Sequence, residues 1–292
     1  MPVSTPATAP SNAHNPQRDA WGILRRRLPA MSLYPVGPYP PGPPRRQGLC
    51  AVCRGPARPG FARCFQCAQH GLLGRGLLAD AVAPVSYAVK GTVFAADLWR
   101  YKSWRTPSPA ARTSLLALLL VFLHDHGGCV WRHAGMPAPG RLAVVPPGGG
   151  RPGPHPLLEL SAPFVRLPVT GLVIRPGQQG RDPNADRYQA ERNAAGASVL
   201  LLDDSWVSGA SAQSAAAALK RAGARHVAVV VLGRHVDPAD RLGGPFAARL
   251  VPMPWALGRS AAGLEPLAGY AGWFPVVGGV FHGFAVRRAR LL

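Results

Sequence analysis

The chain has 292 residues, which is enough for one large domain or for a domain with accessory segments. Its 33 lysines and arginines outnumber 13 acidic residues and give a net charge of +20; the arginines are dispersed, which predicts only weak nucleic-acid binding. The most apolar run, residues 115–123, is too short to cross a bilayer, and residues 1–47 lack a signal-peptide core, so we expect a cytoplasmic protein without membrane contact.

The N-terminal segment is rich in proline. Residues 35–44 read Pro-Val-Gly-Pro-Tyr-Pro-Pro-Gly-Pro-Pro, and residues 1–47 show little helical or strand periodicity. Because such a composition buries too little apolar surface to offset the loss of chain entropy, we predict a disordered or polyproline lead over residues 1–47.

Four of the five cysteines form two pairs with equal internal spacing, Cys50-x-x-Cys53 and Cys64-x-x-Cys67. Two such knuckles can present four thiolates tetrahedrally, which is the geometry that Zn²⁺ accepts. Disulfides are disfavoured in a cytoplasmic chain. We therefore predict a structural zinc module over residues 48–75 with these four cysteines as ligands; iron–sulfur or redox chemistry is the alternative.

The histidines and the fifth cysteine are expected to have no metal role. His70 lies three residues after Cys67 and could be an alternate ligand, but we expect it to be exposed. His124-Asp125-His126 could also bind a metal, although polar residues after a buried helix are expected to meet water. Cys129 lies between glycine and valine and is predicted to be a small buried apolar residue.

Apolar runs alternate with helical segments from residue 82 onward. We predict strands near residues 82–89, 141–145, 171–174, 198–202 and 226–232. We predict helices over residues 93–102, 109–126 and 210–222, a further helix beginning at residues 155–160, and Gly223 as a helix C-cap. The pattern indicates an α/β domain over residues 76–292, with a parallel sheet covered by helices on both faces. Residues 236–292 carry no chemistry that the sequence identifies.

Two adjacent carboxylates end the apolar run at residues 199–202. Asp203 and Asp204 are followed by a small-residue turn, Ser-Trp-Val-Ser-Gly-Ala-Ser, that opens the next helix. Ligands of parallel sheets lie beyond the carboxyl ends of the strands. Carboxylates suit sugar hydroxyls, and the N–H groups and hydroxyls of such a turn suit a phosphate. The pattern predicts a sugar-phosphate site; the alternative is an ordinary turn in which an aspartate caps the helix.

This segment resembles the phosphoribosyl pyrophosphate (PRPP) motif of type I phosphoribosyltransferases, in which two acidic residues precede a Thr-x-x-Gly-x-Thr-like loop. Ser208 and Ser211, in place of threonines, keep the hydroxyls of the loop; Ser208 directly precedes Gly209 and Ser211 follows it by two residues. The resemblance implies that Asp203 and Asp204 are the catalytic pair that holds the ribose hydroxyls. It also implies that the 5′-phosphate is bound by Ser205, Val207, Ser208, Gly209, Ala210 and Ser211.

Pyrophosphate is bound in that family by a turn after a strand. Here the turn reads Pro-Pro-Gly-Gly-Gly-Arg, so the resemblance assigns pyrophosphate to Gly148, Gly149, Gly150 and Arg151. Glycines let N–H groups approach an anion closely, and Arg151 can add a charge-assisted hydrogen bond. The family's usual Arg-Gly-Phe-Asn is replaced by Arg-Pro-Gly-Pro from residue 151, and a flexible linker is the alternative.

A mobile loop closes over PRPP in that family, near the polar stretch 175–197 of this chain. Arg181, Arg187 and Arg192 could supply its cations. They are interleaved with acidic residues, however, and we expect them to be solvated surface charges.

The four cysteines followed by this motif resemble the ComF (competence-type) branch of the family over roughly residues 48–235. The resemblance implies binding of PRPP with Mg²⁺ and transfer of its phosphoribosyl group to an unidentified nitrogen acceptor. Catalysis would be positional and electrostatic. The alternatives are a non-catalytic regulator that binds PRPP or a nucleotide, and a competence-type accessory protein associated with single-stranded DNA.

Overall fold

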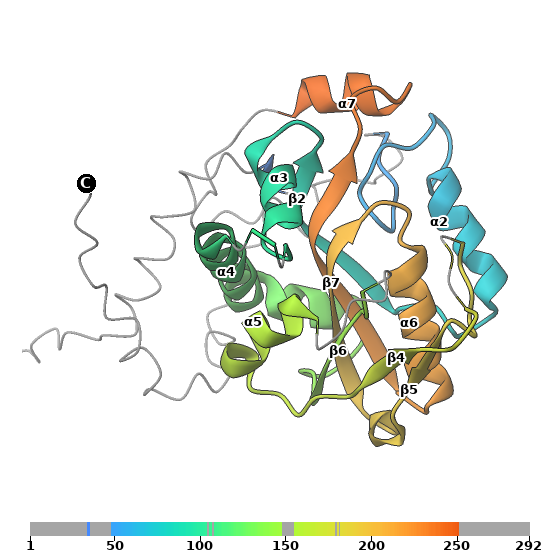
Figure 1. Cartoon of the computed structure of the whole chain (residues 1–292). Coiled ribbons are helices and arrows are strands. Elements are labelled where there is room, and N and C mark those ends of the chain that lie inside the picture. Colours follow the sequence, from blue (N-terminus) through green and yellow to red (C-terminus); the bar gives the residue numbers. More distant parts are fainter. Residues whose placement is uncertain are drawn as a thin grey trace, which may run out of the picture.

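A five-stranded sheet runs through the centre of the molecule (Figure 1). The computed structural model describes residues 34–35, 48–103, 105–106, 108–147, 155–178, 180 and 182–250. In spatial order the strands are β1 (Tyr34–Pro35), β2 (Ala81–Val89), β7 (His226–Val236), β6 (Ser198–Trp206) and β3 (Arg141–Val144). The last four are parallel, as predicted, and β1 pairs antiparallel with β2. The remainder of the predicted lead, residues 1–33 and 36–47, lies outside the described residues.

Helices cover both faces of the sheet. α3 (Val93–Arg100), α4 (Pro109–His133) and α5 (Pro156–Val165) lie on one face, and α6 (Ala210–Arg221) lies on the other. Side chains of Thr92, Ser108 and His155 accept backbone N–H groups at the starts of α3, α4 and α5, as N-caps do. The shorter helical elements are α2 (Phe65–Gln69), η3 (His70–Leu73), η4 (Arg192–Ala194) and α7 (Gly243–Arg249).

Two apolar cores lie on opposite faces of the sheet. Along β6, Leu200 and Leu202 belong to the core that contains α4, whereas Val199 and Leu201 belong to the core that contains α6. All four side chains are fully buried. Because both faces of the strand are covered, its sequence is an unbroken apolar run rather than an alternation with polar residues.

Near the carboxyl ends of β6 and β7, the alternation of side chains between the two faces of the sheet changes phase. Leu202 and Trp206 are four residues apart on β6, yet they lie in opposite cores. On β7, Leu232 belongs to the core on the α4 side, whereas Arg234 contacts Cys53 on the other side. In a regular strand residues two or four apart share a face. The irregularity therefore turns Trp206 and Arg234 toward the cysteine module, as strand irregularities beside binding sites commonly do.

The strand predicted at residues 171–174 is not part of the main sheet. β4 (Leu172–Ile174) pairs antiparallel with β5 (Tyr188–Ala190) in a separate two-stranded sheet. Val173 is exposed, so the prediction of a buried strand is wrong. The chain touches the main sheet earlier, where Val169 forms a single bridge to Leu142 of β3, and the apolar run then continues past the sheet edge to pack beside α6.

α4 is longer than predicted and continues to His133, so His124 and His126 lie within it. It is the one described helix that is long and apolar enough to cross a membrane, but 56% of its most apolar window is buried. It packs on β2 and β7 and against α3 and α5, as the core helix of an α/β domain does. Cys129 is only partly buried, contrary to expectation, because Val130 supplies the buried face at this turn of the helix.

Candidate functional site

Four cysteines converge as their spacing predicts. The Sγ atoms of Cys50, Cys53, Cys64 and Cys67 all lie within 4.8 Å of one another, and those of Cys53 and Cys64 are 3.8 Å apart. Zn–S bonds of about 2.3 Å in a tetrahedron place two sulfurs about 3.8 Å apart, whereas a disulfide needs about 2.05 Å. The cysteines are free thiols. The group therefore fits a tetrahedral metal ion such as zinc.

The two cysteine pairs are built differently. Cys50 and Cys53 lie on a tight turn closed by Arg54, which donates its N–H to the Cys50 carbonyl and has a left-handed φ of 58°. Cys64 is instead the N-cap residue of α2, and Cys67 lies in the first turn of that helix.

A buried arginine lies against this cluster. Nε of Arg234 donates a hydrogen bond to Sγ of Cys53 at 3.3 Å, and only 7% of Arg234 is exposed. Among the residues that the structure describes, the guanidinium contacts carbonyl oxygens and this sulfur but no carboxylate. A buried cation needs a nearby opposite charge. Four thiolates around a divalent ion carry net negative charge, so Arg234 is a fitting counter-ion for a metal–thiolate centre.

His70 is not the exposed residue that we predicted from the sequence. It is 1% exposed and lies outside the four-cysteine group. Its Nε2 donates to the carbonyl oxygen of Ser208 at 3.0 Å, and its ring meets Trp206 edge-on. Burial lowers the pKa of His70, which favours the neutral ring. The residue therefore links the cysteine module to the turn after β6. Within the described ranges, His124 and His126 form no metal-binding group.

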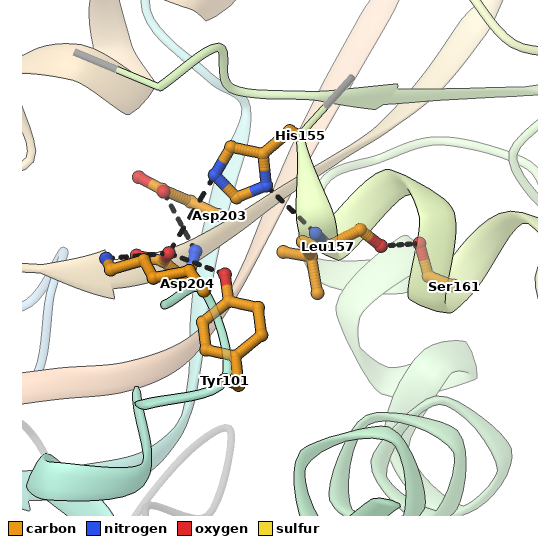
Figure 2. Close-up of polar contacts among 7 residues, drawn as sticks. Tyr101, His155, Leu157, Ser161, Asp203 and Asp204 are labelled. Carbon is orange, nitrogen blue, oxygen red and sulfur yellow. Dashed lines mark hydrogen bonds and ion pairs between the residues drawn. The ribbon is translucent and has the colours of Figure 1, made fainter. Parts of the chain in front are cut away.

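Three side chains from distant segments surround Asp204 (Figure 2). Tyr101 donates to Oδ2 of Asp204 at 2.6 Å and Lys102 donates to the same atom at 3.0 Å, while Nε2 of His155 lies 3.8 Å away. The carboxylate residue is 6% exposed. Burial opposes ionisation, but the charge of Lys102 and the hydrogen bond from Tyr101 outweigh it and lower the pKa of Asp204. Asp204 is therefore ionised at neutral pH.

The surroundings of Asp203 shift its pKa in the opposite direction. Its Oδ1 accepts the backbone N–H of Asp204 at 2.8 Å. Desolvation of the partly buried carboxyl group, together with the negative charge of Asp204, raises the pKa of Asp203 to about 8. Adjacent carboxyl groups whose pKa values are driven apart are typical of functional sites, because the two groups then take different protonation states.

The acid pair lies within β6 rather than beyond its end. The strand continues past the predicted limit at residue 202 because it keeps pairing with β7 as far as Trp206. β3 stops earlier, at Val144, which pairs with Leu202, so β3 does not pair with the acids. Tyr101 and Lys102 reach Asp204 from the end of α3, and His155 reaches it from the start of α5. Tyr101, Lys102 and His155 were not predicted as site residues, because the local sequence marks only the His-Pro pair at the start of α5.

The turn after β6 carries free backbone donors. Gly209 has a left-handed φ of 82° and is the N-cap of the 12-residue helix α6. In the described part of the chain, the N–H groups of Val207, Ser208 and Gly209 donate to no protein acceptor. The Ser208 hydroxyl accepts the N–H of Ala210 at 3.3 Å, and Ser205 belongs to β6. Free N–H groups before a helix are what an anion binds.

Gly209 is also required by packing. A Cβ atom at this position would overlap the indole ring of Trp206. Trp206 is almost completely buried, and its Nε1 has no hydrogen-bond partner among the described residues. The glycine therefore allows both the left-handed turn and the close approach of the indole ring.

Arg187 lies beside this turn, contrary to the prediction that it is a surface charge. The side chain is buried, and Nη1 donates to the hydroxyl of Ser211 at 3.3 Å. Nη2 donates to the carbonyl of Asp182, whereas Nε has no partner among the described residues. Arg187 precedes β5, and the packing of the β4–β5 hairpin beside α6 accounts for its burial. Arg192 is exposed, as expected.

The predicted pyrophosphate residues, Gly148, Gly149, Gly150 and Arg151, lie outside the described residues, as does Arg181. A hollow of about 430 Å³ lies beside Lys102, and its lining consists of Trp99, Lys102, Ser103, Arg105 and Thr106. The ring of Trp99 is exposed. The hollow therefore combines an aromatic surface with two cations, one of which, Lys102, also contacts Asp204.

Comparison of the chain with models of protein families, with curated proteins and with solved structures finds no match.

Proposed function

We propose that the chain binds PRPP at the carboxyl end of β6 and transfers its phosphoribosyl group to a nitrogen acceptor, the function that its resemblance to the ComF branch of the phosphoribosyltransferases implies. The observation that carries the proposal is the direct succession of the acid pair and a turn with free N–H groups. Ribose hydroxyls would donate to Asp203 and Asp204, and the 5′-phosphate would accept from the N–H groups of residues 207–209.

The charges around the turn support an anionic ligand. Arg187 is buried beside Ser211, and its Nε has no acceptor among the described residues. A cation held in a partly buried site attracts a phosphate more strongly than an exposed one, because water screens it less. The turn therefore offers a fixed positive charge in addition to its N–H groups.

The charges around Asp204 suit the proposed transfer. The bond between the ribose anomeric carbon and the pyrophosphate oxygen breaks, positive charge develops on the ribose, and the nitrogen acceptor forms the new bond. A carboxylate held by Tyr101 and Lys102 next to the ribose would stabilise that charge without having to reorganise. Mg²⁺ bound with PRPP would supply charge neutralisation to the departing pyrophosphate.

The hollow beside Lys102 is our candidate for the acceptor. Trp99 offers an exposed aromatic surface, and Lys102 and Arg105 add positive charge. A planar acceptor with acidic substituents fits this combination, since it can stack on the indole and pair with the cations.

A PRPP titration with and without Mg²⁺, followed by thermal shift, tests the binding site. PRPP at about one hundred times its Kd should stabilise the parent by about 2.7 kcal/mol. Asp203→Asn combined with Asp204→Asn should abolish this shift and leave the far-UV circular dichroism unchanged. Asp240→Asn, an exposed change outside the site, is the matched control and should keep the shift. A double variant that binds PRPP as tightly as the parent would refute the site.

Release of pyrophosphate across a panel of nitrogen acceptors tests the reaction. An enzyme should release pyrophosphate only with its acceptor, and the double aspartate variant should release none. If PRPP binds but every acceptor leaves it intact, the regulator that binds PRPP without catalysis is the better description.

A further inference from the structure

Arg234 joins the cysteine cluster to the turn after β6. Its Nε donates to Sγ of Cys53 at 3.3 Å, while Nη1 donates to the carbonyl oxygens of Trp206 at 3.0 Å and Val207 at 3.3 Å. One buried side chain thus contacts a candidate metal ligand and two successive peptide groups of the turn. The planar guanidinium makes this possible, because its donors point in fixed and different directions.

His70 makes the next contact along the same turn. Its Nε2 donates to the carbonyl of Ser208 at 3.0 Å, and it follows α2, the helix that contains Cys67. Three successive carbonyls, those of Trp206, Val207 and Ser208, are therefore held by side chains that belong to the cysteine module or contact it.

The held carbonyls fix the direction of the free N–H groups. In a trans peptide the C=O and the following N–H point to opposite sides of the chain. The structure has no cis peptide bond among the described residues. Holding the carbonyls of residues 206–208 toward the module therefore turns the N–H groups of Val207, Ser208 and Gly209 away from it, where an anion can reach them.

We propose that Arg234 and His70 are positioning residues through which the metal-loaded cysteine module holds the turn at residues 207–209 in its anion-binding conformation. With the ion bound, the two cysteine pairs are fixed together and anchor both side chains. Without it the pairs are no longer tied to one another, and the turn loses the contacts that orient its peptide groups. The proposal rests on the proposed function only for the identity of the anion.

Gly55 gives a way to break this link without changing a ligand or the turn. A Cβ atom at Gly55 would overlap the guanidinium of Arg234, which must then move away. Gly55 has no left-handed φ, so the backbone accepts alanine. Gly71→Ala is the matched control, because it adds the same methyl group to the same module in open space.

Hydrogen exchange on the full-length protein, without any ligand, tests the link. Within residues 205–211 the amides that report are the hydrogen-bonded ones, those of β6 and of Ala210. The zinc-loaded parent and Gly71→Ala should protect them equally, and Gly55→Ala with zinc bound should exchange there about tenfold faster. Residues 226–232 of β7 report global opening and should not change. Chelation of zinc should speed exchange at residues 205–211 in the parent. In Gly55→Ala, where exchange at these residues is already faster, chelation should not increase the rate further.

Two results would overturn the proposal. One is unchanged protection of residues 205–211 in zinc-loaded Gly55→Ala. The other is an equal effect of chelation on the turn in the parent and in Gly55→Ala, which would show that Arg234 does not carry the coupling. Titration with inorganic phosphate then separates this proposal from the PRPP proposal. Faster exchange in Gly55→Ala supports the link even if neither phosphate nor PRPP binds.

Discussion

Tyr101 and Asp204 are joined by a hydrogen bond of 2.6 Å although they lie 103 positions apart in the chain. The contact ties the end of α3 to the acid pair on β6. Together with Lys102 it keeps Asp204 ionised, and the charge of Asp204 in turn contributes to the raised pKa of Asp203. The chemistry of the two adjacent aspartates is thus set by a segment from another part of the sequence.

Asp203→Asn should stabilise the ligand-free protein at neutral and alkaline pH. The unfolded Asp203 loses its proton near pH 3.9, whereas the folded group keeps it to about pH 8, so the parent loses stability as the pH rises through this window. Asparagine carries no charge and avoids this loss. We expect a gain on the order of 1–3 kcal/mol at pH 8 and almost none below pH 4, measured by urea denaturation.

Asp204→Asn is the comparison variant for that experiment. The pKa of Asp204 is lowered, so its contribution is present above the ordinary aspartate pKa and is lost as the pH falls. Asp204→Asn should therefore destabilise at pH 7, by about 1–2 kcal/mol, because Tyr101 and Lys102 lose a charged acceptor. Equal effects of the two substitutions on the free energy of unfolding would contradict the opposite pKa shifts of the two aspartates.

The purified protein should contain about one zinc ion per chain. Cys53→Ser should lower the zinc content and destabilise residues 48–75, because metal binding and local folding are coupled in such modules. Elemental analysis and hydrogen exchange of that segment are the measurements. Iron in place of zinc, or no metal at all, would refute the zinc assignment.

Gly209→Ala should cost more stability than the same change at another left-handed glycine. Gly177 has a φ of 75° and open space around its Cα, so Gly177→Ala measures backbone strain alone. Gly209→Ala adds the overlap with Trp206, and we expect it to cost about 1–3 kcal/mol more. Thermal denaturation of both variants checks this, and equal losses would show that the indole ring adjusts freely.

Binding of single-stranded DNA should be weak and lost at moderate salt. The net charge of +20 favours contact with phosphates, but the arginines are dispersed along the chain. Fluorescence anisotropy across a salt series measures the affinity and the number of ions released. Tight binding near physiological salt that PRPP competes away would instead favour the competence-type accessory protein associated with single-stranded DNA. In that case the exposed Trp99 would be a stacking platform, and Trp99→Ala should weaken binding.

Local patterns were enough to predict the four parallel strands and the cysteine cluster. The run at residues 199–202 is apolar because both faces of β6 are covered, and the Cys-x-x-Cys spacing brings sulfurs together within a single turn. Each of these features depends on neighbours a few residues away. The run at residues 171–174 has the same local pattern but does not join the main sheet. The chain forms one bridge to β3 at Val169, and the run that follows pairs with β5 instead.

The amino-acid sequence by itself determined the α/β alternation, the cluster of four thiols and the succession of two acids and a glycine turn. Only the tertiary structure decided which side chains surround them. Tyr101 and His155 meet Asp204 because folding brings the end of α3 and the start of α5 beside β6. Arg234 faces Cys53 because the alternation of side chains along β7 changes phase. Arg187 is buried because the β4–β5 hairpin packs on α6. Periodicity and spacing record the neighbours of a residue along the chain, whereas burial and charge pairing depend on segments brought together by folding.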